Sequence, residues 1–344
     1  MIPYLFLMAI PAIFSFMPSN KNSFNQKILL FFVGIIYIMF TAFRHEVSLD
    51  WSSYIRMYAL IKSNSSLEEA LSITEPSFVI LNWIMAKMDA GVYGVNFVIA
   101  IIFISGVFRF VAQMPRPWLA LLSVTPYLVI VISMSAVRQA AAIGLVFHLL
   151  AVWNQGITKK ILLAFIATSF HYSAFVSVVL VLLNIKLPSW LKWVVLLSGS
   201  VISLYIFTRT EQYIIYKGAY LGKGAIESFG ALQHAALNAI PASIYLFFIK
   251  KWNALYGKNQ LMFILSILSL LSMVGVFFSS TAVDRLALYL SPIQMLIYST
   301  IPIVFKSEIY AYIIIIIHIA ILLIWLLYSN SSYAFLPYNN ILFI

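Results

Sequence analysis

Several ionisable side chains stand at the edges of long apolar stretches, where charged groups are costly and are therefore candidates for function. Arg44 ends one such stretch and is followed by Asp50 and Tyr54, and Glu75 stands directly before Pro76 at the start of the next stretch. Carboxylates in such a place can take a proton from a reacting hydroxyl group. A second explanation remains for Glu75, because a Glu before a Pro is also an ordinary way to begin a helix.

Two further arginines have the chemistry of phosphate ligands. Arg138 and Gln139 lie between two strongly apolar runs, and Asp284 and Arg285 precede Tyr289. A guanidinium group stays charged at any pH and presents a planar fork of donors that matches a phosphate group. Each arginine also has a plain explanation. Arg138 is equally well explained as a boundary residue whose head group reaches to the membrane surface, and Arg285 as the partner of Asp284 in a local ion pair.

A histidine stands in the middle of an apolar run. His171 and Tyr172 lie near the centre of Ile161–Ile185, which holds no charged residue. One continuous helix would bury His171 near the membrane centre. Two short helices joined by a turn would instead bring it to the outer surface, level with Arg44, Asp50 and Arg138. Histidine can act as a general base near neutral pH or donate a hydrogen bond between helices.

No pattern typical of a nucleotide, metal or serine-nucleophile site occurs. The sequence has no Walker loop, no metal-ligand spacing of the His-Glu-x-x-His kind and no Gly-x-Ser-x-Gly elbow. It also has no cysteine, which excludes thiol nucleophiles and iron–sulfur clusters. We therefore expect neither a metal nor another cofactor.

The elements that must hold these residues are membrane helices. Of the 344 residues 63% are hydrophobic and 9% charged, whereas soluble domains carry roughly 25% charged residues. A helix needs about 20 apolar residues to cross the hydrocarbon core, and in lipid its backbone amides must be paired internally. We predict an all-α polytopic membrane protein with one transmembrane domain over residues 1–344, in which Ile2–Met17 is a first membrane helix rather than a signal peptide. Uncharged runs near the required length are Ile28–Phe43, Trp118–Val137, Gln139–Thr158, Ile161–Ile185, Trp193–Thr208, Asn259–Val283, Leu286–Phe305 and Ile309–Tyr328.

The basic residues allow topologies to be compared. The net charge of +11 follows the usual enrichment of Lys and Arg in cytoplasmic loops, so nucleic acid is not an expected partner. If the N-terminus lies outside and every run crosses once, 10 basic residues fall inside and 11 outside, which is no bias. If Ser77–Ala112 begins with a short dip at Ser77–Ala86, and Ile161–Ile185 folds as two short helices, 12 fall inside and 8 outside, with Lys87 unassigned. We prefer this second topology; the alternative is that Ile161–Ile185 is one ordinary span.

The preferred topology also separates the acids, with 8 outside, Glu308 inside and Asp89 unassigned. It predicts about ten full spans plus short or re-entrant helices, with outside loops at about 44–76 and 209–232. The second loop combines aromatic and basic side chains, which suit contact with carbohydrate or lipid head groups, although a belt of interfacial anchors explains them equally well. These side chains are Arg209, Tyr213, Tyr216, Lys217, Tyr220 and Lys223.

Taken in order, these segments resemble the EpsG-type branch of the Wzy-like polysaccharide polymerases. The matching segments span nearly the whole chain. One departure concerns the first motif: the family often has a Gly shortly before its Asp, and Ser48 stands at that place here, which puts the aim of Asp50 in question. The matching segments are Phe43-Arg44 with Asp50 and Tyr54, Glu75-Pro76, Arg138-Gln139 with Ala142, Phe170-His171-Tyr172-Ser173-Ala174, Asp284-Arg285 with Tyr289, and Leu336-Pro337-Tyr338.

The resemblance implies a glycosyltransferase of the bacterial inner membrane that polymerises O-antigen, capsule or exopolysaccharide. Such enzymes resemble the membrane-embedded lipid-carrier glycosyltransferases. They move a growing glycan from an undecaprenyl-diphosphate carrier onto a second carrier-linked repeat unit at the periplasmic or outer face. The implied partners are undecaprenyl-diphosphate-linked glycans and membrane lipids, with a chain-length regulator as a further candidate.

That reaction assigns expected roles to the residues singled out above. Charge grows on the leaving diphosphate, which calls for positioned arginines; the candidates are Arg44, Arg138 and Arg285. The attacking hydroxyl loses a proton, which calls for a base. The candidate bases are Asp50, Glu75 and His171, and we slightly prefer His171 because an uncharged histidine in an apolar setting needs the least desolvation. Tyr54, Gln139, Tyr172, Asp284 and Tyr289 are the candidate substrate contacts.

Two other functions fit a polytopic chain with these residues. A carrier-lipid flippase or other transporter would need charged residues along both halves of a central path, whereas the acids here fall almost all on one side. A membrane-bound acyltransferase that modifies sugars would need a catalytic histidine within the membrane, for which His148 and His171 are candidates.

Overall fold

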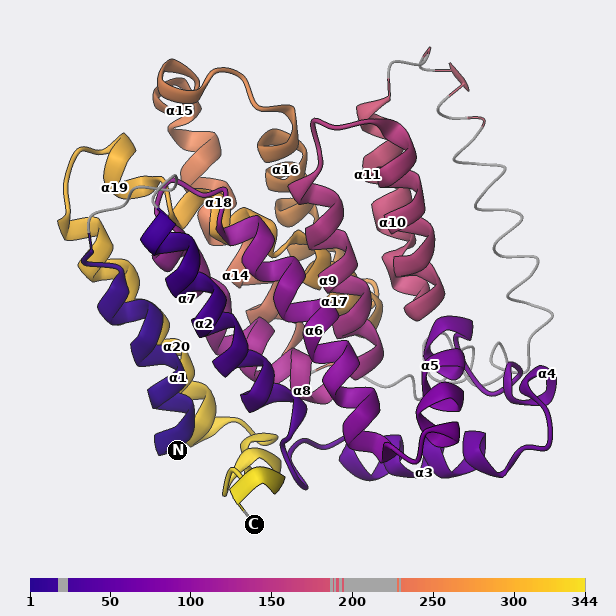
Figure 1. The fold of residues 1–344 in the computed structure, drawn as a ribbon. Coiled ribbons are helices and arrows are strands. Elements are labelled where there is room, and N and C mark those ends of the chain that lie inside the picture. Colours follow the sequence, from indigo (N-terminus) through magenta and orange to yellow (C-terminus); the bar gives the residue numbers. More distant parts are fainter. Residues whose placement is uncertain are drawn as a thin grey trace.

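The computed structural model describes residues 1–17, 24–185, 188, 190–191, 194, 228 and 230–343, and within them the chain forms helices joined by short turns (Figure 1). No strand occurs among these residues, and an isolated bridge pairs Arg44 with Asn340. The predicted all-α class is confirmed. The elements are α1 (Ile2–Phe14), α2 (Phe24–Ala42), α3 (Trp51–Ser63), α4 (Leu67–Ala70), α5 (Pro76–Lys87), α6 (Gly91–Val111), α7 (Pro117–Val124), the π-helix η1 (Thr125–Ile132), α8 (Ser133–Ser135), α9 (Val137–Ala151), α10 (Ile157–Phe170), η2 (Tyr172–Phe175), α11 (Val176–Asn184), α14 (Ala231–Phe247), α15 (Ile249–Tyr256), α16 (Gln260–Gly275), α17 (Ser280–Ala287), η3 (Leu288–Leu290), α18 (Pro292–Tyr298), α19 (Ile301–Val304), α20 (Ile309–Tyr328), η4 (Ser332–Phe335) and η5 (Ile341–Phe343).

Four segments are long and apolar enough to cross a membrane, namely α2, α6, the continuous Pro117–Ser135 and α20. Two bent pairs would each add one span: α14 with α15, bent by 77°, and Ser280–Leu290 with Pro292–Val304, bent by 45°. The described part of the chain therefore holds four to six such spans by length and composition. The count of about ten stays a prediction, and most of the predicted span Trp193–Thr208 lies outside the described residues.

The charged side chains gather at two opposite ends of the bundle. At one end α6 terminates and α7, α10 and α20 begin, close to α15 (top of Figure 1). There Arg116, which precedes α7, lies 2.7 Å from Glu308, which precedes α20. At the opposite end α2 terminates and α3, α6 and α9 begin. The sequence-based sorting of the described charged residues into two groups agrees with this arrangement. The first end holds Lys27, Arg109, Arg116, Lys159, Lys160, Lys250, Lys251, Lys258, Lys306 and Glu308, and the second holds Arg44, Glu46, Asp50, Arg56, Lys62, Glu68, Glu69, Glu75, Arg138, Asp284 and Arg285.

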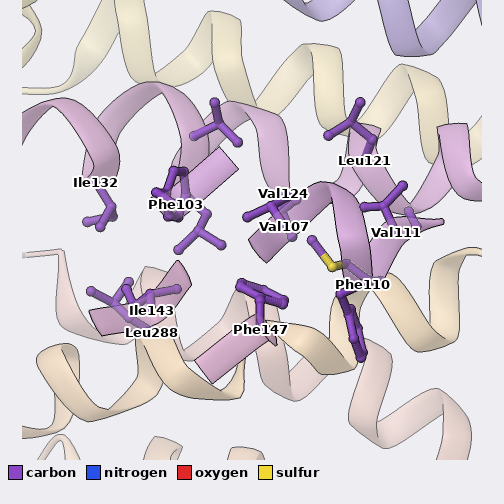
Figure 2. Close-up of a cluster of buried hydrophobic side chains, with 14 of the residues drawn as sticks. Phe103, Val107, Phe110, Val111, Leu121, Val124, Ile132, Ile143, Phe147 and Leu288 are labelled. Atoms are coloured by element: carbon purple, nitrogen blue, oxygen red, sulfur yellow. The ribbon is translucent and has the colours of Figure 1, made fainter. Parts of the chain in front are cut away.

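The core is densest where α6 crosses α9. A Cβ atom on Gly106 would lie 2.1 Å from the carbonyl oxygen of Gly144, and a Cβ atom on Gly144 would lie 2.5 Å from the Cα atom of Phe103. Small residues of this kind let two membrane helices approach until their backbones touch. Figure 2 shows the buried side chains around this region, with Phe103 from α6, Val124 from α7 and Phe147 from α9 packed near one another.

The apolar run Ile161–Ile185 is broken at His171, as the preferred topology requires. α10 ends at Phe170, His171 is extended with φ −157° and ψ 124°, and a short 3-10 turn leads into α11. The Nζ atom of Lys160 near the start of α10 lies 2.6 Å from Oδ1 of Asn184 at the end of α11. The two helices are therefore antiparallel, and the alternative of one ordinary span is wrong.

The run that follows the first predicted outside loop also begins with a short helix. α5 has 12 residues, and a turn at Met88–Ala90 separates it from the 21-residue α6. Lys62 at the end of α3 lies 3.2 Å from Asp89 in this turn, which places Asp89 at the same end of the bundle as α3. Residues 44–76, predicted as a loop, contain α3 and α4, whereas residues 209–227 of the other predicted loop lie outside the described residues.

Candidate active site

A cavity of about 440 Å³ lies at the end of the bundle where α9 begins. Its walls come from α3, from the start of α9, from the turn after α10 and from α17. It gathers residues that lie more than 200 positions apart in the sequence, among them most of the predicted site residues. Those that line it are Asp50, Tyr54, Arg138, Gln139, His171, Asp284 and Arg285.

Arg138 reaches the cavity from a break in the helix that precedes it. Ala136, with φ −92° and ψ 64°, separates the end of α8 from α9, so that Arg138 stands in the first turn of a new helix. Its Nη1 atom donates to Oε2 of Glu75 and, at 2.5 Å, to the hydroxyl of Thr74. The plain explanation of Arg138 as a residue that extends to the membrane surface therefore does not hold, because its head group has a buried carboxylate partner.

Glu75 is the N-terminal residue of α5, but its side chain makes no capping bond to that helix. It is fully buried and accepts hydrogen bonds from Arg138 and Thr74 instead. Burial alone would raise the pKa of the Glu75 carboxyl, but the charge of Arg138, with a smaller contribution from His171, outweighs it and leaves the pKa below its ordinary value. Glu75 is thus an ionised partner of Arg138 at neutral pH, and a poor base.

The imidazole of His171 is held between Ser173 and Arg285. Its Nδ1 atom lies 3.2 Å from the backbone nitrogen of Ser173 and 2.7 Å from the hydroxyl oxygen of the same residue. Its Nε2 atom lies 3.5 Å from Nη1 of Arg285. Burial lowers the pKa of His171 to about 4, against the opposing effect of Glu75. The ring is therefore neutral near pH 7, and a group with so low a pKa is a weak proton acceptor.

Ser173 connects this histidine to the other walls. Its hydroxyl oxygen lies 3.0 Å from the Tyr289 hydroxyl and 3.4 Å from Nε2 of Gln139. Gln139 also donates from Nε2 to the backbone carbonyl of Arg285 at 2.7 Å. One hydrogen-bonded network thus fixes α9, the turn after α10 and α17 relative to one another. Tyr289 belongs to this network behind the cavity wall, whereas the neighbouring Tyr172 is 40% exposed and does not line the cavity.

Asp50 faces the cavity from the residue before α3 and makes no capping bond to that helix. Asp50 is exposed by its surface area, while the protein packed around its carboxylate still removes that group partly from water. This burial raises the pKa of Asp50, while the charges of Arg285 and Arg138 act in the opposite direction. Asp50 lines the cavity, whereas Glu75 is fully buried against Arg138 and both ring nitrogens of His171 face donors. Asp50 is therefore the best placed of the three to accept a proton.

Arg44 does not line this cavity. Its guanidinium is 2% exposed, donates to the carbonyl oxygen of Thr41 at 2.6 Å and lies 5.9 Å from the ring centroid of Trp51. It borders a separate space of about 10 Å³ beside Asn96, and burial lowers its pKa to about 10. The structure therefore brings Arg138, His171 and Arg285 together and leaves Arg44 apart, so its geometry does not support the expected contact with a diphosphate in that cavity.

The family model for the EpsG family matches residues 27–340. The chain belongs to the EpsG family. No curated protein and no solved structure matches the chain. Membership of the EpsG family supports a role of the polysaccharide-polymerase type, and the match covers every element that contributes to the cavity.

The segment before Asp50 shows how this EpsG family chain accommodates its departure from the first motif. Ser48 has a φ of 96°, in a region that favours glycine, so a serine there is strained. Its backbone N–H donates to the carbonyl oxygen of Ala334 at 2.7 Å, and that of His45 donates to Asn339 at 3.0 Å. The C-terminal segment thus holds this turn and with it the start of α3.

His234 lies beside the cavity wall, and no role was predicted for it. Its Nδ1 atom lies 2.7 Å from Oδ1 of Asp284, and the imidazole stacks on the Tyr127 ring with 4.0 Å between centroids. The available signal was a histidine at the boundary between the predicted loop 209–232 and the following apolar helix. Nothing in the local sequence indicates that Asp284, 50 residues later, is its partner.

Proposed function

We propose that this EpsG family chain is a glycosyltransferase that joins undecaprenyl-diphosphate-linked oligosaccharide repeat units. The observation that carries the proposal is the meeting of Arg138, Arg285 and Asp50 in one cavity at one end of a helical membrane bundle. Two guanidinium groups suit a diphosphate, and a carboxylate beside them suits the activation of a sugar hydroxyl. The cavity volume of about 440 Å³ falls within the size range of small-molecule sites.

The reaction forms a bond between the acceptor hydroxyl oxygen and the anomeric carbon of the donor sugar. The bond from that carbon to the diphosphate oxygen breaks, and its electron pair leaves with the lipid diphosphate. Arg285 and Arg138 stabilise the charge that grows on this leaving group. Arg138 does so while it is paired with Glu75.

The hydroxyl proton goes to Asp50. This assignment replaces the initial preference for His171, whose Nδ1 atom faces the backbone N–H of Ser173. Its Nε2 atom faces the guanidinium of Arg285, which can only donate, so both ring nitrogens lie against donors and neither is open to take the proton of a sugar hydroxyl. In this role His171 orients the site, together with Gln139 and Tyr289, without taking up the proton.

The cavity faces the periplasm or outer surface of the bacterial inner membrane in this proposal. The support is the charge distribution. The described basic residues predominate at the end of the bundle opposite to the cavity, and Glu308 is the only acid at that end among the residues that the structure describes. Lys and Arg are enriched on the cytoplasmic side of membrane proteins. A repeat unit would therefore be polymerised after its transfer across the membrane.

The direct test replaces Arg285 by Ala in a strain whose polymer depends on this chain. We expect single repeat units on the outer face in place of long glycan chains, with normal levels of the variant protein. Arg109→Ala, at the opposite end of the bundle, is the matched control and should leave chain length unchanged. Repeat units that accumulate on the inner face would indicate a flippase instead, and normal chains that lack acyl groups would indicate an acyltransferase.

A further inference from the structure

Asp284 is the one acid of the cavity wall that is held through both carboxylate oxygens. Its Oδ1 atom lies 2.7 Å from Nδ1 of His234, and its Oδ2 atom accepts a hydrogen bond from the Ser228 hydroxyl at 2.8 Å. The backbone N–H of Ser228 is fixed in turn by the hydroxyl of Ser280 at 3.1 Å. A carboxylate bound in this way has a fixed direction, and its remaining lone pairs can accept further hydrogen bonds.

The imidazole of His234 also packs against Tyr127 and Gly230. Tyr127 covers one face, with 4.0 Å between ring centroids and 28° between ring planes, and its hydroxyl oxygen lies 2.6 Å from the same Nδ1 atom. Gly230 supplies the room on the other side, because a Cβ atom there would lie 2.6 Å from Cε1 and 2.9 Å from Nε2 of His234. Gly230 has φ −92° and ψ −4°, which any residue can adopt, so space rather than conformation requires glycine.

These contacts determine where the imidazole proton lies. An ionised carboxylate only accepts hydrogen bonds, so Nδ1 of His234 must carry the proton that it shares with Asp284. The Tyr127 hydroxyl oxygen then accepts a hydrogen bond from the same N–H group, which is shared between Tyr127 and Asp284. The π-helix η1 supplies Tyr127, and such helices are rare and frequent at functional sites.

We propose that His234 is a positioning residue of the polymerisation site, which donates its Nδ1 proton to Asp284 and, with Ser228, aims this carboxylate at hydroxyl groups of the bound sugar. The inference rests on the proposed function for the identity of the ligand. Asp284 is adjacent to Arg285, so a sugar bound by this carboxylate lies next to the arginine that would bind the diphosphate. His234 acts through Asp284 and does not itself line the larger cavity.

The test compares His234→Asn with His234→Gln in the purified full chain. The amide of Asn can occupy the place of Nδ1, whereas that of Gln occupies the place of Nε2, so only Asn preserves the donor to Asp284. With lipid-diphosphate-linked repeat units as substrate, His234→Gln should raise KM by about 10- to 100-fold, as expected for the loss of one charge-assisted hydrogen bond. His234→Asn should stay within about threefold of the unsubstituted protein, and kcat should change little in both variants.

A second variant reaches the same contact without changing the histidine. Gly230→Ala forces the imidazole away from Asp284 and should raise KM as His234→Gln does. Gly156→Ala is the matched control, because nothing lies within 4 Å of a Cβ atom at that position. If His234→Asn, His234→Gln and Gly230→Ala all have equal KM values and still form polymer, the positioning role is overturned. The proposed function then remains intact.

A spectroscopic measurement tests the contact independently of any activity. Nitrogen-15 labelling of the histidine rings in the full chain, with His234→Asn to assign the signal, should show the proton of His234 on Nδ1. Asp284→Asn should abolish this preference. A proton on Nε2 in the unsubstituted protein would overturn the proposal, even if the chain polymerised nothing and the proposed function failed on its own.

Discussion

Arg138 and Glu75 form an ion pair in which the carboxylate is fully buried while the guanidinium remains 20% exposed. Glu75 thus holds Arg138 at the wall of the cavity, which Arg138 also lines. The pair joins α5 to α9 across 63 residues of sequence. The Glu75 carboxylate partly offsets the charge of Arg138 and fixes the orientation of its guanidinium group. This arrangement is expected of a preorganised anion site.

Replacement of Glu75 by Ala should destabilise the protein by about 3 kcal/mol, because it leaves a partly buried guanidinium without its carboxylate. Glu75→Gln should cost less, since the amide oxygen still accepts a hydrogen bond from Arg138. Thermal unfolding in detergent measures both. Since the folded pKa of Glu75 lies below the unfolded value, the stabilisation is complete above the unfolded pKa of about 4.3 and is lost as the pH falls through the folded pKa. Unchanged melting temperatures in both variants would contradict the pair's contribution.

The pH dependence of polymerisation should identify the base. Burial raises the pKa of Asp50, so the rate should fall on the acid side at a pH above the ordinary value of about 3.9 for an aspartate. Asp50→Asn should lower the rate by about 10²- to 10⁴-fold and remove this dependence. His171→Asn should leave the acid-side fall in place. A fall that disappears in His171→Asn and persists in Asp50→Asn would assign the proton to His171 instead.

The ionisation of His171 should affect the pH dependence of folding stability rather than that of the polymerisation rate. Its folded pKa is about 4, whereas the unfolded value is about 6.5. The unfolded chain therefore binds a proton that the folded chain does not bind between these two values, and stability falls as the pH is lowered from about 6.5 to about 4. The measurement is the melting temperature across this range, which should depend less on pH in His171→Gln.

The sequence allowed the broken helix at His171 to be predicted because charge bias acts at the level of whole loops. Counting basic residues on each side tests where the chain turns back, without any knowledge of contacts. The clustering of Asp50, Arg138 and Arg285 was expected from the family resemblance, and the structure places them around one cavity. The position of Arg44 outside this cavity was not predictable, because it depends on contacts with Thr41 and Trp51 that the motif does not reveal.

The role of His234 could not be predicted from the sequence, because it depends on contacts between distant segments. Its neighbours Tyr127 and Asp284 lie 107 and 50 residues away, and its importance comes from the packing of α14 against η1 and α17. A histidine at the edge of an apolar run has the same local sequence whether it meets a carboxylate or a lipid. The space at Gly230 is equally invisible, since a glycine before a helix is ordinary and only the packed imidazole requires it.

Replacement by Met should affect glycan chain length at Arg285 but not at Arg44. Arg44 is buried outside the cavity, so Arg44→Met exchanges a buried cation for an apolar chain of similar length, which is often neutral for stability. Chain length of the glycan should stay normal. Arg285→Met removes a cation from the cavity wall and should abolish long chains at unchanged protein levels. Loss of polymer in Arg44→Met, with the protein present and stable, would indicate that Arg44 does contribute to polymerisation.

The contact between α6 and α9 should be intolerant of even one methyl group, and this matters for the site because α9 carries Arg138. In Gly144→Ala the new Cβ atom would meet the Cα atom of Phe103 at 2.5 Å, which is backbone and cannot rotate away. The helices must separate, at a cost of about 1 to 3 kcal/mol. Gly34→Ala in α2 is the matched control, because its Cβ atom would meet the Phe108 ring at 3.5 Å, an ordinary contact. Melting temperatures in detergent should therefore fall for Gly144→Ala and hold for Gly34→Ala; an equal response would mean that α9 can shift without loss, and that its backbone contact with α6 does not fix the position of Arg138.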